Sequence, residues 1–194
     1  MDSSPSSSSR QVYRIDEHDR LCEVDCGWMD VAGAIPPTQV LGRSLWEFVR
    51  DPTVIAVYRQ MIRQARAGRV LRFRYRCDAP EWRRLYEMTI QSCGSSRVEF
   101  ASQLVREEAR KPVTLLDRSL GPRSRELVRI CSWCERAALP GGGWLPIEEA
   151  VEALGVMQHD TMPQLTHGIC ERCFARVKRS FELGGDRFDP GAGG

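Results

Sequence analysis

Two Cys-x-x-Cys pairs constrain the fold of this chain more than any other feature. The first pair is Cys131 and Cys134, and the second is Cys170 and Cys173. Two such pairs can place four thiolates at the corners of a tetrahedron, the arrangement that a structural zinc ion prefers. Residues 135–169 separate the pairs, a longer gap than in the commonest zinc ribbons, so the gap itself is expected to be folded. The sequence therefore predicts a zinc site formed by these four cysteines.

The residues around each pair predict how the thiols are presented. Ile130 leads into the first pair, which favours a short extended entry and a tight knuckle. After the second pair, Phe174, Val177 and Phe181 recur at helical spacing, which places that pair in the first turn of a helix. There the free amide groups and the positive end of the helix dipole favour thiolates. A knuckle followed by a helix-borne pair resembles a treble-clef site in a small, α-rich, zinc-stabilised module.

Other interpretations of these cysteines remain open. They could be four free thiols in a core, or two redox dithiols that cycle with disulfides. His167, three residues before the second pair, is a further candidate ligand. Because four thiols are already available, we expect His167 to cap a turn or to hydrogen-bond to a thiolate instead.

The composition indicates a soluble globular protein. Its 194 residues suffice for one ordinary domain and a small second one, and 42% are hydrophobic and 28% charged. No apolar stretch is long enough to cross a membrane and no export leader is recognised, so cytoplasmic residence is expected. In that reducing compartment the eight cysteines are expected to be metal ligands or thiols rather than disulfides. The remaining four are scattered and are interpreted as structural: Cys22, Cys26, Cys77 and Cys93.

Periodicity in the first half predicts an α+β layer architecture. A helical segment is expected over residues 40–49, and a longer helix from Pro52, capped by Asp51, to Gly68. Alternating apolar residues and turn chemistry predict five strands, at residues 12–15, 21–24, 70–77, 84–91 and 97–105. These strands are expected to form an antiparallel five-stranded sheet with the helices on one face.

Two stretches carry a resemblance to known families. Leu41 to Phe48 is similar to a helix entry of PAS domains, and Phe73 to Asp78, with Arg83 and Arg84, resembles a strand in a bacterial PAS subset. The C-terminal part is similar to a cysteine module that follows PAS or receiver domains in bacterial signalling proteins. It matches in Cys131 to Cys134, Trp144, Glu148, Glu149 and Thr166 to Cys173.

The PAS resemblance implies a small ligand held between sheet and helices, or a dimerising relay. The pocket would be lined by Tyr58, Ile62, Phe73, Tyr75, Tyr86 and Met88, although such residues commonly just fill a core. No Asn-Cys-Arg string is present, so a flavin adduct is not expected. Haem is not expected either, because the only histidine of this region is His18, in a hairpin turn.

These observations divide the chain into parts. We expect a Ser-rich disordered tail at 1–10, a PAS-like sensor domain at 11–107, a linker or connector helix at 108–129 that could start at Ser124, a four-cysteine zinc module at 130–184, and a Gly-rich disordered tail at 185–194. In PAS proteins such a connector often transmits a change to an output.

The resulting hypothesis is a non-catalytic cytoplasmic signalling protein. Its PAS domain would sense a ligand or dimerise, and its zinc module would contact a protein partner. No phosphate-binding glycine loop or recognisable acid–base pair is seen, so an enzyme is not expected. The alternatives are a thiol–disulfide redox protein and a zinc-dependent nucleic-acid-binding regulator. Against the latter, positive and negative side chains balance over residues 123–187, so neither specific nucleic acid nor a membrane is an expected partner.

Overall fold

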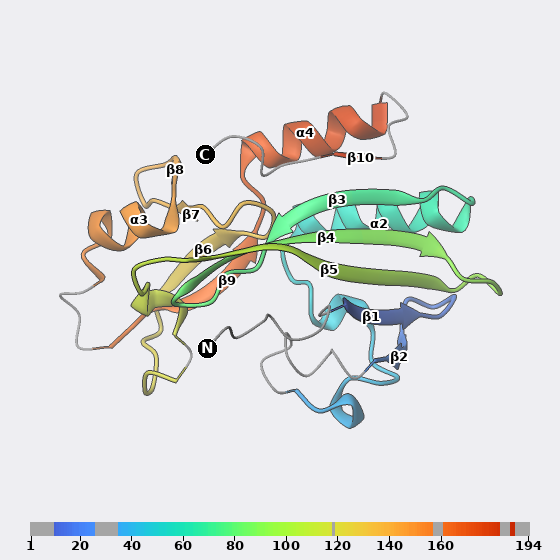
Figure 1. Ribbon diagram of the computed structural model, residues 1–194, viewed down its shortest axis with the longest axis horizontal. Helices are drawn as coiled ribbons and strands as arrows, with labels where there is room; N and C mark the ends of the chain where they lie inside the picture. Colours follow the sequence, from blue (N-terminus) through green and yellow to red (C-terminus); the bar gives the residue numbers. More distant parts are fainter. Residues whose placement is uncertain (1–9, 26–34, 118, 157–160, 183–186, 189–194) are drawn as a thin grey trace, which may run out of the picture.

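The larger of two β-sheets has the strand order β10-β3-β4-β5-β1-β2 (Figure 1). The computed structural model describes residues 10–25, 35–117, 119–156, 161–182 and 187–188. The strands are β1 (Arg10–Ile15), β2 (Leu21–Val24), β3 (Leu71–Arg76), β4 (Trp82–Ser92), β5 (Val98–Ala109) and β10 (Arg187–Phe188). Strands β1 to β5 pair antiparallel, which confirms the predicted five-stranded sheet and the α+β, PAS-like fold.

A sixth strand extends this sheet beyond the prediction. Strand β10 pairs parallel with β3 and comes from the Gly-rich segment at 185–194 that was predicted to be disordered. For residues 187–188 that prediction was wrong, because β3 would otherwise leave its outer backbone groups unpaired at the sheet edge. The rest of that segment, like residues 1–9 of the Ser-rich tail, lies outside the described residues.

Helix α2 (Pro52–Arg66) covers one face of the sheet and contacts β4 and β5 (Figure 1). It starts as predicted, because the Asp51 carboxylate accepts hydrogen bonds from the amides of Thr53 and Val54, each 3.0 Å long, and Pro52 needs no partner. Its buried residues recur at helical spacing and form one face of the helix: Val54, Val57, Met61, Ile62 and Ala65.

The helix expected over residues 40–49 is shorter than predicted. Within it only one 3-10 turn forms, η2 (Leu45–Glu47), and another, η1 (Pro37–Gln39), precedes it. Gly42 has a φ of +78° and Ser44 is extended, so a continuous helix cannot pass through them. Ser44 instead opens η2 through a capping box with Glu47. The segment 28–34 and Cys26 lie outside the described residues.

A second, four-stranded sheet belongs to the C-terminal part and was not predicted. Its order is β8-β7-β6-β9, and β6 and β9 run parallel. The strands are β6 (Leu127–Cys131), β7 (Ala137–Ala138), β8 (Trp144–Leu145) and β9 (Gln164–Gly168); the helices are η3 (Thr114–Leu116), α3 (Ile147–Ala153) and α4 (Glu171–Glu182). The predicted helix at the second cysteine pair is present as α4, and α3 follows Pro146.

The predicted connector helix from Ser124 is wrong. Strand β6 occupies that position, and its side chains alternate: Val128 and Ile130 are buried, whereas Leu127 and Arg129 are exposed. That two-residue period fits a strand with one buried face, and pairing with β9 satisfies its backbone. The preceding segment also packs, because Val113 and Leu115 are buried in a core with β6 and α3.

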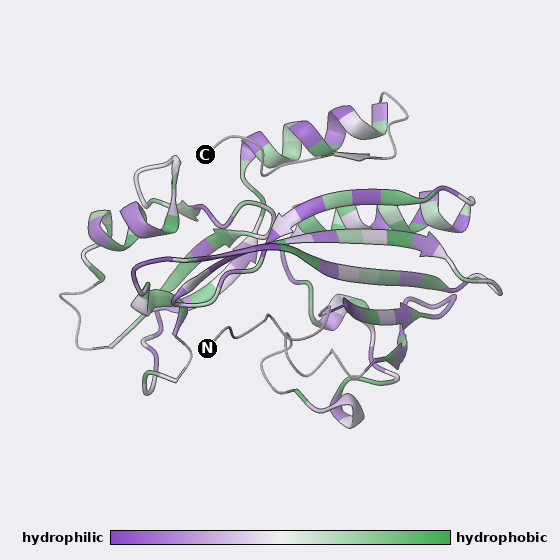
Figure 2. Cartoon of the chain, in the orientation of Figure 1, coloured by the Kyte–Doolittle hydropathy of each residue, from purple (hydrophilic) through white to green (hydrophobic). Residues whose placement is uncertain are grey.

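Buried apolar residues form two clusters. One lies wholly in the C-terminal part and includes Leu115, Ile130 and Ile147. The other contains the inner face of the PAS-like sheet and α2, and also Trp133, Ile169 and Val177 from the cysteine region. Apolar and polar residues alternate along β3, β4 and β5 in Figure 2. The predicted sensor and cysteine parts therefore share one hydrophobic core. None of the helices in the described residues is long and apolar enough to cross a membrane.

Candidate metal centre

The four predicted cysteine ligands lie together. Their sulfur atoms are all within 4.8 Å of one another, and Cys134 Sγ and Cys170 Sγ are 3.7 Å apart. A tetrahedron with metal–sulfur bonds of about 2.3 Å has edges of about 3.8 Å. Cys131 ends β6, Cys134 follows in a turn, and Cys170 and Cys173 flank the start of α4. The four sulfurs therefore fit a metal ion with tetrahedral thiolate ligands.

Backbone amides stabilise this cluster in two ways: some donate hydrogen bonds to carbonyls of the knuckle, and others donate to the cysteine sulfurs. The Cys131 amide donates to the carbonyl of Arg136 (2.8 Å), and the Glu135 amide donates to the carbonyl of Cys131 (3.0 Å), which closes the knuckle. Glu135 has a φ of +59°, the left-handed conformation that reverses the chain here. The amide of Cys170 donates to Cys131 Sγ at 3.4 Å, and that of Cys173 to Cys170 Sγ at 3.5 Å. Such donors stabilise thiolates.

The thiols affect one another's ionisation. Hydrogen bonding with Cys131 lowers the pKa of both Cys134 and Cys170, while hydrogen bonding with neighbouring thiols raises the pKa of Cys131 and Cys173. Burial raises the pKa of the adjacent Glu135 to about 8. Its carboxyl is therefore mostly neutral at pH 7 and adds little negative charge beside the thiolates. A bound cation would favour the thiolate form of all four ligands.

His167 lies on β9, opposite Ile130 of β6, and its side chain is exposed. The hydrogen bonds to Cys131 and Cys170 described above come from backbone amides. A bond from His167 to a thiolate stays a prediction. Among the described residues the cysteines are free thiols.

The residues predicted to line a ligand pocket do lie near one another. Ile62, Phe73, Tyr86 and Met88 are buried, and Tyr58 and Tyr75 pack partly buried against them. The ring centroids of Phe73 and Tyr75 are 6.2 Å apart, and those of Tyr75 and Tyr86 are 5.6 Å apart. These contacts form the core between the sheet and α2; whether a ligand enters it stays a prediction.

Trp133, between the first two ligands, reaches into that same core. Its side chain is 1% exposed, and its ring centroid lies 6.1 Å from Tyr58 and 6.2 Å from Phe73. The Trp133 carbonyl accepts a hydrogen bond from the amide of Arg76 at the end of β3 (3.0 Å). This role of Trp133 was not predicted from the sequence. The available signal was the placement of a large apolar side chain between two ligands, where a surface knuckle would expose it.

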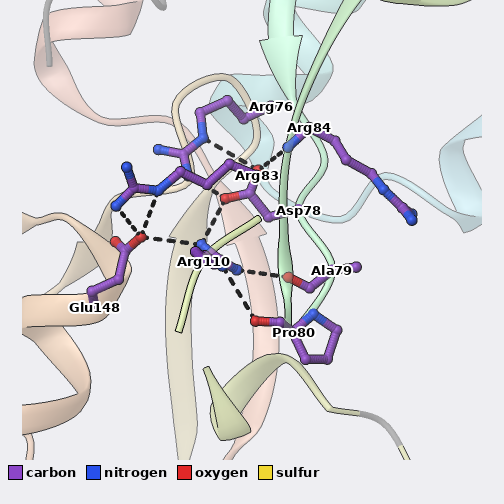
Figure 3. Close-up of polar contacts among 8 residues, drawn as sticks. All are labelled: Arg76, Asp78, Ala79, Pro80, Arg83, Arg84, Arg110 and Glu148. Carbon is purple, nitrogen blue, oxygen red and sulfur yellow. Dashed lines mark hydrogen bonds and ion pairs between the residues drawn. The ribbon is translucent and has the colours of Figure 1, made fainter. Parts of the chain in front are cut away.

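Charged side chains also join the two parts (Figure 3). Arg110 Nη1 lies 2.9 Å from Asp78 Oδ2 and 3.2 Å from Glu148 Oε1, and Arg110 also donates to the carbonyls of Ala79 and Pro80. The side chains of Asp78 and Arg110 are 0% and 4% exposed. Arg83 pairs with the same Glu148 oxygen at 2.6 Å. Glu148 lies on α3, so this network ties α3 to the β3–β4 hairpin.

Other arginines of β3 and β4 are paired within the chain. Arg76 pairs with Asp78, Arg84 with Glu107 at 2.6 Å and Arg74 with Glu87 at 3.7 Å. Much of the local positive charge is thus compensated.

Comparisons with known proteins found no matching protein family and no matching curated protein. Among solved structures, the chain is similar to the photoactive yellow protein domain of the sensor histidine kinase Ppr from Rhodospirillum centenum. That match has 13% identity and a TM-score of 0.38, and covers 48% of this chain and 83% of the other. A second is a domain of an HTR-like protein from Haloarcula marismortui, with 14% identity, a TM-score of 0.35, and coverage of 51% and 100%. Values this low support no inference about function, and the fold assignment rests on the strand order described above.

Proposed function

We propose that this protein is a non-catalytic, cytoplasmic signalling protein with a zinc-stabilised output. The PAS-like domain would sense a small ligand or form a homodimer, and the four-cysteine module would bind zinc and contact a protein partner. The observation that supports the metal most directly is the set of four sulfurs within 4.8 Å of one another. Thiolates in this number and geometry suit zinc, and in a cytoplasmic protein they favour a structural site.

Coupling between sensor and output is supported by the shared core. Trp133 packs against Tyr58 and Phe73, so a rearrangement of the sensor core would be felt at the knuckle that carries Cys131 and Cys134. Packed cores tend to switch between discrete arrangements rather than deform continuously. The contact of Trp133 with the sensor core would transmit the signal directly, in place of the connector helix that was expected from the sequence.

Metal analysis tests the proposal. We expect one zinc per chain in protein purified without chelator, and a loss of most of that zinc in Cys170→Ser, because a ligand at the start of α4 is removed. Cys93→Ser is the matched control, since Cys93 is exposed and outside the cluster. Less than about a third of an equivalent of zinc in the wild type, with all four thiols freely titratable, would contradict the zinc site.

A redox function is the second candidate, and one observation favours it. Cys134 is only partly buried and its pKa is lowered by hydrogen bonding with Cys131, which are properties of a reactive thiolate. Such a thiolate could attack a partner's disulfide, form a mixed disulfide and release the partner as a dithiol once a second cysteine attacks. Rapid exchange with a model disulfide in the metal-loaded protein would favour this function, whereas reactivity only after metal removal would favour zinc.

We do not expect specific nucleic-acid binding, because Arg74, Arg76 and Arg84 are already paired with carboxylates of this chain. Sequence-selective DNA binding that persists at physiological salt would contradict it.

A further inference from the structure

Trp133 lies in the middle of a continuous row of aromatic rings. On one side, Tyr58 packs on Phe100 with a centroid distance of 6.3 Å, and Phe100 stacks on Tyr13 at 4.6 Å. On the other side, Phe73 leads to Tyr75 and then to Tyr86. Trp133 is the ring that joins the two halves, because it contacts both Tyr58 and Phe73. We call the site between these last two residues the aromatic site.

The aromatic site holds Trp133 by shape and not by a side-chain hydrogen bond. In the part of the chain that the structure describes, the buried indole Nε1 has no hydrogen-bond acceptor. An unpaired buried N–H is unfavourable, so packing alone holds the Trp133 ring in the aromatic site. The backbone bond between Trp133 and Arg76 depends on the knuckle conformation, and the two cysteines of this knuckle, Cys131 and Cys134, belong to the thiol cluster.

We propose that Trp133 is an intramolecular ligand of the aromatic site, and that a free planar aromatic molecule of about the size of indole replaces it when the metal centre is empty. This inference rests on the proposed metal function. Metal binding closes the knuckle and inserts Trp133, whereas metal loss lets the side chain withdraw. The metal and the free aromatic molecule therefore compete, and each lowers the affinity of the protein for the other by the same factor.

The first test is rescue of Trp133→Gly by indole. This change leaves an apolar cavity of indole shape, and such cavities stay dry and bind aromatic molecules. We expect the Tm to fall by roughly 10 °C or more, and millimolar indole to restore a large part of that fall. Trp144→Gly is the matched control, because Trp144 is only partly buried and lies under Arg129 of β6, so indole should not restore it. An unchanged Tm of Trp133→Gly with indole would contradict the inference.

The second test compares the wild type with and without metal. We expect indole to bind the chelated protein and to bind the metal-loaded protein at least about tenfold more weakly, a coupling of ordinary size. A chelator competition should show metal affinity falling in saturating indole. Equal indole binding by both forms, or none by the chelated form, would overturn the inference. Because this test uses the wild type, it can support or overturn the inference even if Trp133→Gly fails to fold.

The two proposals fail in different ways. Wild-type protein that takes up no metal would overturn the proposed metal centre. Metal uptake without competition from indole would overturn only the exchange at the aromatic site. Rescue of Trp133→Gly by indole reports on the position of Trp133 whether or not metal is present.

Discussion

The Asp51 carboxylate both caps helix α2 and forms an ion pair with Arg129. One oxygen caps α2 through the amides of Thr53 and Val54, and the other lies 2.5 Å from Arg129 Nη2 of β6. The guanidinium of Arg129 also covers Gly168, where a Cβ atom would lie 2.1 Å from Nε. A side chain at position 168, close to the four-cysteine cluster, would therefore have to displace this guanidinium, which reaches the PAS-like domain.

We expect Asp51→Ala to lower the free energy of unfolding by about 1 kcal/mol, through loss of the cap. Arg129→Ala should cost less, about 0.5 kcal/mol, because Arg129 is 43% exposed and water screens the pair. Urea denaturation of both single variants and the double variant measures this, and the double-mutant cycle isolates the pair. Equal losses in the two single variants would show that the ion pair, and not the cap, dominates.

Helix α3 is held to the β3–β4 hairpin by charge. Burial acts to raise the pKa of Glu148, but hydrogen bonds from its own amide and from Arg83 outweigh it and lower the pKa. A lowered carboxyl pKa means that the folded state gains stability above the ordinary value of 4.5 and loses it as the pH falls further. Asp78, at 0% exposure, depends on Arg110 far more than the partly exposed Glu148 does.

We therefore expect Arg110→Ala to destabilise the protein by about 3–5 kcal/mol, because it leaves the Asp78 charge buried beside fewer partners. Glu148→Gln is the matched change at the other end of the network, with an expected loss of about 1 kcal/mol or less. It should also reduce the loss of stability below pH 4.5. Denaturation at several pH values measures both effects. A larger loss in Glu148→Gln than in Arg110→Ala would contradict this assignment.

The shared core predicts that the two parts unfold together. Trp133, Ile169 and Val177 are buried with Phe73 and Met61, so the cysteine region cannot melt without exposing part of the PAS-like core. The contrasting arrangement, two independent parts on a tether, would melt in two steps.

We expect metal removal, or Cys131→Ser with Cys134→Ser, to reduce hydrogen-exchange protection in β3 and β5 as well as in β6 and β9. Calorimetry of the metal-loaded wild type should show one cooperative transition. Cys22→Ser, at an exposed thiol on β2, is the control and should change neither result. Unchanged protection in β3 and β5, with β6 and β9 alone exposed, would indicate a tether.

Local pattern alone determined much of this protein. The five strands and α2 were predictable because side-chain period and the Asp51–Pro52 start act within a few residues. The four cysteines were predictable as a group because ligand spacing is a local signature. The same kind of rule produced the wrong helix at Ser124, since the short run before Cys131 fits either period until β9 pairs with it.

Tertiary structure decided what the cysteine module packs against. No local pattern indicates that Trp133 inserts between Tyr58 and Phe73, or that Arg110 meets Asp78 and Glu148. These contacts join residues far apart in the chain. Burial and charge pairing depend on neighbours in space. The sequence therefore determined the five strands, α2 and the cysteine cluster, whereas tertiary packing determined the second sheet and the core that the two sheets share.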